Sequence, residues 1–144
     1  MPYSEMLIAP MRGELVSIGA KELKSGRAVD EQLNTQGTTL LVVNSVCGCA
    51  AGRARPGIAL SLRNKIKPDT LATVFAGADI EATARAREHL APYPPSSPAI
   101  GLFRDGRLVW MMERWQIEGQ DSLAISRQLA EAFDKHCAPA TQET

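Results

Sequence analysis

The sequence predicts an α/β sandwich in which one mixed central β-sheet carries helices on both faces. Two largely apolar segments, residues 40–46 and 71–76, have the length and composition of strands buried on both sides. A segment with helical periodicity connects them, so these two strands should run parallel. Residues 99–104 and 107–112 flank Asp105-Gly106, a strong hairpin signal that adds two antiparallel strands.

Length and composition favour one domain of ordinary globular type. The chain has 144 residues, of which 44% are hydrophobic and 22% charged. We expect a single domain over residues 1–144, with residues 1–24 as an N-terminal helical extension and residues 138–144 as a frayed tail. The 16 basic and 16 acidic residues cancel, so the composition indicates neither nucleic acid nor a membrane as partner.

The N-terminal third is predicted to hold two short helices and an edge strand. Pro10 is well placed to open the first helix, and Gly19 to stop it. Residues 20–23 fit a short edge strand. Val29 and Leu33, four residues apart, then mark the buried face of the second helix.

The later helices follow the strands. After the first long strand, a helix that Pro56 either opens or kinks should run to residue 67, with Ile58, Leu62 and Ile66 on one face. Asp79 can cap the helix that follows the second strand. The last helix begins at about Asp121, with an apolar face of Ile125, Leu129, Ala132 and Phe133. This order of elements is that of a thioredoxin-like three-layer sandwich.

The N-terminal residues show no export signal. Residues 1–8 contain neither a basic leader nor an apolar stretch of secretory length, and no segment approaches the ~20 apolar residues of a membrane helix. We therefore expect a cytoplasmic protein. Structural disulfides are rare in that compartment, so a close pair of cysteines is expected to be catalytic or metal-binding.

Cys47-Gly48-Cys49, directly after the first long strand, is the motif that points to chemistry. A thiolate rather than a thiol attacks a disulfide, and a helix N-terminus lowers the pKa of a cysteine placed there. Cys47 ends the strand and precedes a helix, which predicts that it attacks and that Cys49 resolves the mixed disulfide. Arg53 and Arg55 lie close enough in sequence to add positive charge.

The one-residue spacer should make a disulfide within this motif easy to reduce. A bond that spans so short a loop departs from relaxed geometry, and Gly48 tolerates the backbone angles that it needs. We expect a weaker reductant and a better exchanger than a Cys-x-x-Cys protein of the same fold.

Two other interpretations of the cysteines, as structural residues or as metal ligands, fit the pattern less well. Buried structural cysteines are common, but two of them within three residues at a strand-to-helix junction are unusual. A metal or iron–sulfur site needs about four ligands, and Cys137, His136 and His89 do not have ligand-like spacing, so no metal is predicted. Cys137 is expected to complete the apolar face of the last helix and to be dispensable.

Ser97-Pro98 closes a proline-rich segment, residues 91–98, directly before a predicted strand. In thioredoxin-like folds a cis-proline at this place lies against the dithiol and presents its backbone to an extended substrate. We therefore predict a cis Ser97–Pro98 bond within contact distance of the cysteines. With Gly48, these residues form the expected substrate-binding set.

The sequence around the cysteines resembles the bacilliredoxin family, small bacterial thioredoxin-like proteins with a Cys-Gly-Cys centre. The resemblance is carried by residues 43–52, read as Val-Asn-Ser-Val-Cys-Gly-Cys-Ala-Ala-Gly, and continues over nearly the whole chain. Further matching segments are Tyr3-Ser4-Glu5, Pro10-Met11-Arg12, Ala54-Arg55-Pro56, residues 94–98, Asp105-Gly106 and Ile117-Glu118-Gly119. One departure is Trp115-Gln116, where a histidine-bearing stretch is expected.

The resemblance implies a thiol-disulfide oxidoreductase that removes bacillithiol from proteins carrying it as a mixed disulfide. It implies that Cys47 is the attacking residue and Cys49 the resolving one. The low-molecular-weight thiol is then a co-substrate, no cofactor is needed, and the partners are S-thiolated or disulfide-bearing proteins. Disulfide isomerase activity, or a redox switch on the same fold that binds partners without turnover, are the alternatives.

Overall fold

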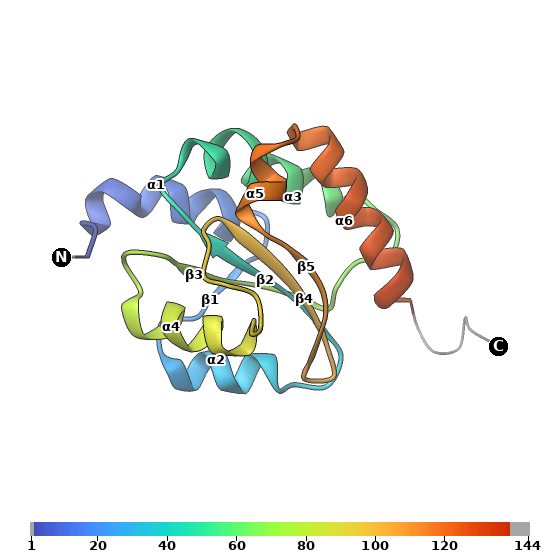
Figure 1. The fold of residues 1–144 in the computed structure, drawn as a ribbon, viewed down its shortest axis with the longest axis horizontal. Helices are drawn as coiled ribbons and strands as arrows, with labels where there is room; N and C mark the ends of the chain where they lie inside the picture. Colours follow the sequence, from blue (N-terminus) through green and yellow to red (C-terminus); the bar gives the residue numbers. More distant parts are fainter. Residues whose placement is uncertain (1, 139–144) are drawn as a thin grey trace.

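The computed structural model describes residues 2–138, and Figure 1 shows their arrangement. The expected frayed tail, residues 138–144, therefore lies outside the described residues apart from Ala138. In chain order the elements are α1 (Glu5–Val16), β1 (Lys21–Glu22), α2 (Gly26–Leu33), β2 (Thr38–Asn44), the π-helical turn η1 (Ala50–Ala54), α3 (Arg55–Ser61), β3 (Thr70–Phe75), α4 (Ile80–His89), β4 (Ala99–Arg104), β5 (Arg107–Met112), α5 (Arg114–Glu118) and α6 (Ser122–His136).

The five strands form one mixed sheet in the order β1-β3-β2-β4-β5. β1, β3 and β2 run parallel, whereas β4 pairs antiparallel with β2 and with β5. Helices α2 and α4 cover one face, and α1, α3 and α6 cover the other (Figure 1). The predicted α/β sandwich, its parallel pair, its hairpin and its short edge strand are all confirmed.

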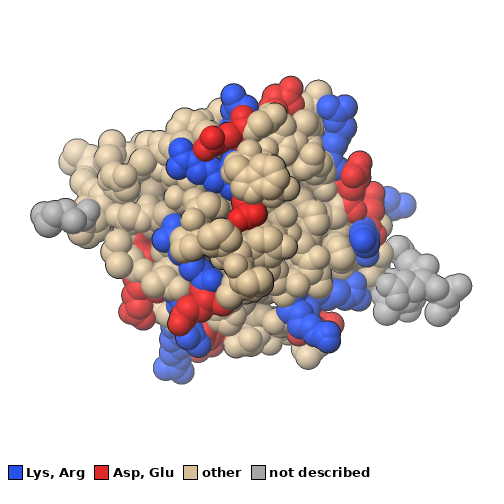
Figure 2. Space-filling view, viewed as in Figure 1, with Lys and Arg blue, Asp and Glu red and all other residues tan. Residues whose placement is uncertain are grey.

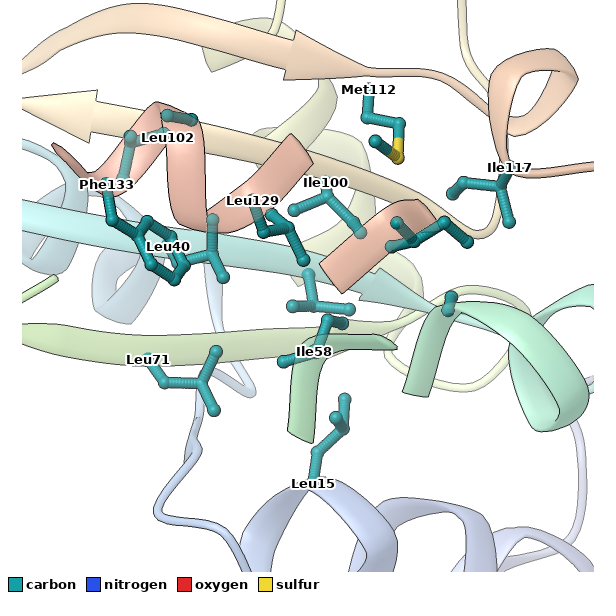
Figure 3. Close-up of a cluster of buried hydrophobic side chains, with 14 of the residues drawn as sticks. Leu15, Leu40, Ile58, Leu71, Ile100, Leu102, Met112, Ile117, Leu129 and Phe133 are labelled. Atoms are coloured by element: carbon teal, nitrogen blue, oxygen red, sulfur yellow. The ribbon is translucent and has the colours of Figure 1, made fainter. Parts of the chain in front are cut away.

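Each face of the sheet has its own apolar core, because β2 is buried along its whole length and alternates its side chains between the two faces. Leu40 and Val42 point to the α3/α6 side, and Leu41 and Val43 to the α2/α4 side. Figure 3 shows the first of these cores, in which the strand residues meet α3 and α6; its labelled members are Leu15, Leu40, Ile58, Leu71, Ile100, Leu102, Met112, Ile117, Leu129 and Phe133. Packing on both faces thus fixes the position of β2 and of the residues that follow it.

The prediction that Pro10 opens the first helix is wrong, because α1 begins five residues earlier. Ser4 caps the helix, and its Oγ accepts a hydrogen bond from the Leu7 amide at 3.4 Å. Pro10 lies inside the helix, where its missing N–H leaves the Met6 carbonyl without its usual partner. Met6 is exposed, so water can satisfy that group.

The helix predicted to run to residue 67 is also shorter than expected, because α3 ends at Ser61. Asn64 turns the chain by donating from Nδ2 to the Ile66 carbonyl at 2.7 Å and to Asp134 at 2.9 Å. Ile66 still packs on the core, but from outside the helix. Pro56 lies one turn into the helical segment, where the π-helical turn passes into α3.

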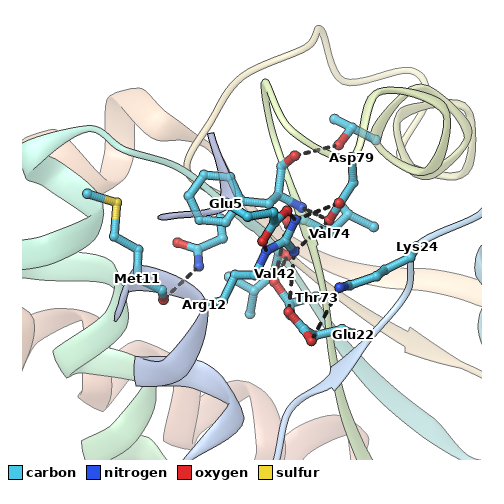
Figure 4. Close-up of polar contacts among 12 residues, drawn as sticks. Glu5, Met11, Arg12, Glu22, Lys24, Val42, Thr73, Val74 and Asp79 are labelled. Carbon is cyan, nitrogen blue, oxygen red and sulfur yellow. Dashed lines mark hydrogen bonds and ion pairs between the residues drawn. The ribbon is translucent and has the colours of Figure 1, made fainter. Parts of the chain in front are cut away.

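A buried ion-pair cluster fixes α1 to the rest of the domain (Figure 4). The Arg12 guanidinium lies within 2.7 Å of Asp79, 2.9 Å of Glu5 and 3.3 Å of Glu22, and it stacks over the Phe75 ring. Arg12 is 7% exposed. These contacts join α1 to β1, to the end of β3 and to the start of α4. Within residues 2–138, none of the helices is both long enough and apolar enough to cross a membrane.

Candidate active site

The dithiol lies at the carboxyl end of β2, where the chain turns into the helical segment that leads to α3. The Cys47 carbonyl accepts hydrogen bonds from the amides of Ala50, at 3.0 Å, and Ala51, at 3.3 Å. The Cys47 sulfur accepts from the Cys49 amide at 3.3 Å. Cys47 therefore occupies the N-cap position of the helix, and its sulfur takes the place of the usual serine or aspartate oxygen.

This placement separates the acidities of the two thiols. The pKa of Cys47 is lowered, first by the hydrogen bond from the Cys49 amide and then by the Cys49 thiol and the charge of Arg114. The pKa of Cys49 is raised, first by burial and then by its side-chain hydrogen bond and its charge interaction with Cys47. Cys47 is thus the thiolate at lower pH, and Cys49 remains a thiol beside it.

A hydrogen-bonded loop holds the strand end in place below the cysteines. Ser45 Oγ accepts from the Cys47 amide at 3.1 Å, and Asn44 Oδ1 accepts from the Ser45 amide at 2.8 Å. Arg55 Nη1 donates to Asn44 Oδ1 at 2.9 Å and to the Ser45 carbonyl at 3.0 Å. Asn44 Nδ2 in turn donates to the Met11 carbonyl of α1 at 3.2 Å. Arg55 is thus engaged in holding the loop.

Arg53 also makes hydrogen bonds that hold the structure around the dithiol. Its Nη1 donates to the carbonyls of Glu118, at 2.8 Å, and Gln120, at 2.9 Å. These groups belong to the carboxyl end of α5 and the residues after it, which would otherwise be unpaired. Arg53 therefore ties α5 to the helix that follows the dithiol.

The Ser97–Pro98 bond is cis, as the sequence predicts, and so is the Ala91–Pro92 bond, which was not expected. β4 begins at Ala99, which pairs with Val43 of β2. Continuing that register places buried Pro98 beside Asn44 and Ser97 beside Ser45, on the strand that leads to Cys47. The predicted substrate-binding residues Ser97 and Pro98 thus lie at the same sheet end as the dithiol, and Gly48 is exposed there.

Helix α5 was not predicted from the sequence, and it adds a third segment to this end of the sheet. Glu113 and Gln116 form a capping box at its start, and Ile117 anchors it in the core. The Arg114 amide donates to Ser96 Oγ at 3.4 Å, and its Nη1 donates to the Ser97 carbonyl at 3.2 Å. Its Nε pairs with Glu118, one turn further along α5. The E-x-x-Q pattern over residues 113–116 was the available signal.

Cys137 lies at the opposite end of the sheet. It lines a small cavity with Thr38, where β2 begins, and with Arg104, where β4 ends. The seven residues of β2 extend about 20 Å, so this thiol is remote from Cys47. Burial raises the pKa of Cys137. The cysteine packs against the core as the sequence predicts.

We predict that Cys137→Ser leaves the rate of disulfide exchange unchanged within a factor of about two, or roughly 0.5 kcal/mol of barrier. A disulfide to either active-site cysteine needs α-carbons within about 7 Å, far less than the separation of the two sheet ends. Steady-state exchange rates of the variant and the parent protein check this. A tenfold loss in a variant with an unchanged circular dichroism spectrum would make Cys137 a third redox cysteine.

Comparison with known proteins agrees with this geometry. Residues 3–137 match the model of a family described as Disulphide isomerase. A bacilliredoxin of Cytophaga hutchinsonii is 50% identical over 133 residues, which cover 92% of this chain and 98% of the relative. A bacilliredoxin of Halalkalibacterium halodurans is 49% identical over 136 residues, covering 94% of both chains.

Solved structures with a similar fold include thioredoxins. A thioredoxin variant of Halobacterium salinarum superposes with a TM-score of 0.57 at 15% identity, over 85% of this chain and 95% of that one. The thioredoxin of Fasciola hepatica gives 0.57 at 17% identity, over 81% and 98%. At these identities the likeness establishes the thioredoxin fold. The family match over nearly the whole chain, together with relatives at half identity, shows that this protein belongs to the bacilliredoxin family.

Proposed function

We propose that this thiol-disulfide oxidoreductase resolves mixed disulfides between bacillithiol and proteins by dithiol exchange at Cys47 and Cys49. The observation that carries the proposal is the Cys47 sulfur at the N-cap of a helix, with its pKa lowered, and a second thiol of raised pKa two residues on. An attacking thiolate beside a protonated resolving thiol is the arrangement that two-step exchange requires. The names of the relatives support bacillithiol as the thiol.

The reaction proceeds in two displacements. The Cys47 thiolate attacks the bacillithiol sulfur of the mixed disulfide, and the protein sulfur leaves as a thiolate that takes a proton from water. Cys49 then loses its proton and attacks Cys47, which releases bacillithiol and leaves a Cys47–Cys49 disulfide. Two electrons have passed from the dithiol to the substrate, and a thiol reductant returns them. Gly48 gives the short loop the freedom that the closed form needs.

The surroundings of the dithiol favour a protein as the thiolated partner. The Ser97 carbonyl has two lone pairs, of which Arg114 takes one, so it can still accept from an extended substrate. Trp115 on α5 is 69% exposed, and its indole N–H is held by Glu113 at 3.1 Å. In the view of Figure 2, uncharged side chains cover much of the middle of the molecule, with an acidic group at the centre.

The test compares defined substrates on one carrier protein, thiolated with bacillithiol, glutathione or coenzyme A. With a thiol reductant present, we expect multiple turnovers on the bacillithiol adduct and at least about a tenfold lower kcat/KM on the other two, or 1.4 kcal/mol of discrimination. The Cys47→Ala variant is the control for background exchange. Equal rates on all three adducts would leave a general oxidoreductase and remove the bacillithiol preference.

Disulfide isomerase activity is a second candidate, favoured by the description of the matching family. An isomerase rearranges a scrambled protein without net reduction, so refolding of a scrambled disulfide protein measures it directly. A redox switch is distinguished by stoichiometry, because it reacts once per chain even with reductant in excess. The cytoplasmic location stays a prediction from the sequence.

A further inference from the structure

Three segments meet at the end of the sheet that carries the dithiol. The loop after β2 supplies the cysteines, the residues before β4 supply Ser96 and Ser97, and α5 supplies Arg114 and Glu118. Arg53 holds the carboxyl end of α5 to the redox helix. The position of α5 relative to the cysteines is therefore fixed from both of its ends.

The Arg114 side chain is restrained although it is at the surface. Its Nη1 donates to the Ser97 carbonyl at 3.2 Å, and its Nε pairs with Glu118. A guanidinium is planar and remains charged at any pH relevant to thiols, so two such contacts orient a permanent positive charge. That charge is the one that acts most strongly on the Cys47 sulfur.

The other charged groups near the dithiol have different partners. Arg55 is buried against Asn44 and the Ser45 carbonyl, and Arg53 is taken up by the carbonyls after α5. Glu113 accepts from the Trp115 indole and caps α5. Arg114 and Glu118 are the charged side chains that act on the pKa values of the two thiols.

This pair acts unequally on the two sulfurs. Arg114 lowers the pKa of Cys47, and Glu118 contributes to raising the pKa of Cys49. Arg114 also lowers the pKa of Cys49, but there the nearby carboxylate opposes it. The two charges lie one helical turn apart along α5. Arg114, at the start of α5, is bonded to the Ser97 carbonyl before β4, whereas the Glu118 carbonyl, at the end of α5, is bonded to Arg53 of the turn that follows Cys49.

We propose that the Arg114–Glu118 ion pair is a positioning device that keeps the negative charge of the dithiol on Cys47 rather than on Cys49. The inference rests on the proposed function, in which Cys47 attacks and Cys49 resolves. It deepens that function, because it assigns the choice of the attacking sulfur to two residues outside the Cys-Gly-Cys motif. Arg114 and Glu118 are positioning residues, since they act through the thiols.

The experiment measures alkylation by iodoacetamide as a function of pH for each thiol separately. All variants carry Cys137→Ser, with Cys49→Ala to isolate Cys47 or Cys47→Ala to isolate Cys49. We expect Arg114→Gln to raise the pH midpoint of Cys47 and to slow its alkylation at pH 7 by about three- to tenfold, because the reactive thiolate fraction falls. Arg114→Lys, which keeps the charge, should restore most of that rate.

Glu118→Gln is expected to have its main effect on the other thiol. It should speed alkylation of Cys49 at pH 7 by about two- to fivefold and change Cys47 less than Cys49, because it removes a nearby negative charge. Arg107→Gln is the matched control, because Arg107 begins β5, the strand that leads to α5, at the hairpin tip and far end of the sheet. It should move neither midpoint.

The outcomes separate this inference from the proposed function. Unchanged midpoints in Arg114→Gln and Glu118→Gln overturn the inference, even where Cys49→Ala still traps substrate on Cys47. Trapping on Cys49 instead of Cys47 overturns the proposed assignment of roles, whatever the alkylation rates show. A loss of rate in Arg114→Gln with no shift of midpoint, unrescued by Arg114→Lys, makes the residue structural and also overturns the inference.

Discussion

Replacing Cys47 with alanine is expected to abolish exchange, with a loss of at least about a thousandfold in rate, because no other group replaces a missing nucleophile. Cys49→Ala should instead accumulate a stable mixed disulfide on Cys47, since the first displacement proceeds and the second cannot. Intact-mass spectrometry of each variant after incubation with a thiolated protein detects the adduct. Peptide mapping then identifies the cysteine that carries it.

The pH dependence supplies the control for this assignment. The pKa of Cys47 is lowered. Its thiolate fraction should therefore rise with pH and reach half its maximum at a pH below about 8.5, the pKa of an ordinary cysteine. Trapping by Cys49→Ala should follow the same curve. An adduct found on Cys49 in the Cys47→Ala variant, formed at the parent rate, would reverse the two roles.

The sequence was sufficient to predict the sheet because each strand is indicated by the composition of its own segment. Residues 40–46 and 71–76 are largely apolar, which predicts strands buried on both faces. Asp105-Gly106 specifies a hairpin, which predicts the β4–β5 pair. The cysteines could be placed for the same reason, since a strand end before a helix is a local feature. The thioredoxin fold then indicated the position of Ser97-Pro98.

The remaining parts of the site depend on contacts between distant segments. Arg114 is 67 residues from Cys47 in sequence, and only the register of β2, β4 and β5 brings its helix to the dithiol. Arg53 and Arg55 are near in sequence yet have structural partners instead. Proximity along the chain pointed to Arg53 and Arg55 and could not indicate Arg114, because a helix turns successive side chains in different directions.

Removal of the Arg12 guanidinium is expected to lower the stability of the domain strongly. Arg12 is nearly buried with Asp79, whose carboxylate also accepts from the Phe75 amide at 3.1 Å. Arg12→Met leaves that carboxylate buried without its cation, which typically destabilises by about 3–5 kcal/mol. For a domain of this size the midpoint of thermal unfolding should fall by about 10–20 °C. Differential scanning calorimetry measures it.

Two further variants show that the loss comes from the buried charge. Arg27→Met breaks the exposed Arg27–Glu31 pair on α2, a contact of the same type at 2.9 Å, and should change stability by under about 0.5 kcal/mol because solvent screens it. Arg12→Met combined with Asp79→Asn should recover part of the loss, since the amide oxygen can still accept from Phe75 while the unpaired charge is gone. Equal midpoints for Arg12→Met and Arg27→Met would show that this cluster contributes no more than a surface ion pair. If the midpoint falls in Arg12→Met and stays as low in the double variant, the guanidinium acts through its packing on Phe75 and its bonds to Glu5 and Glu22 instead.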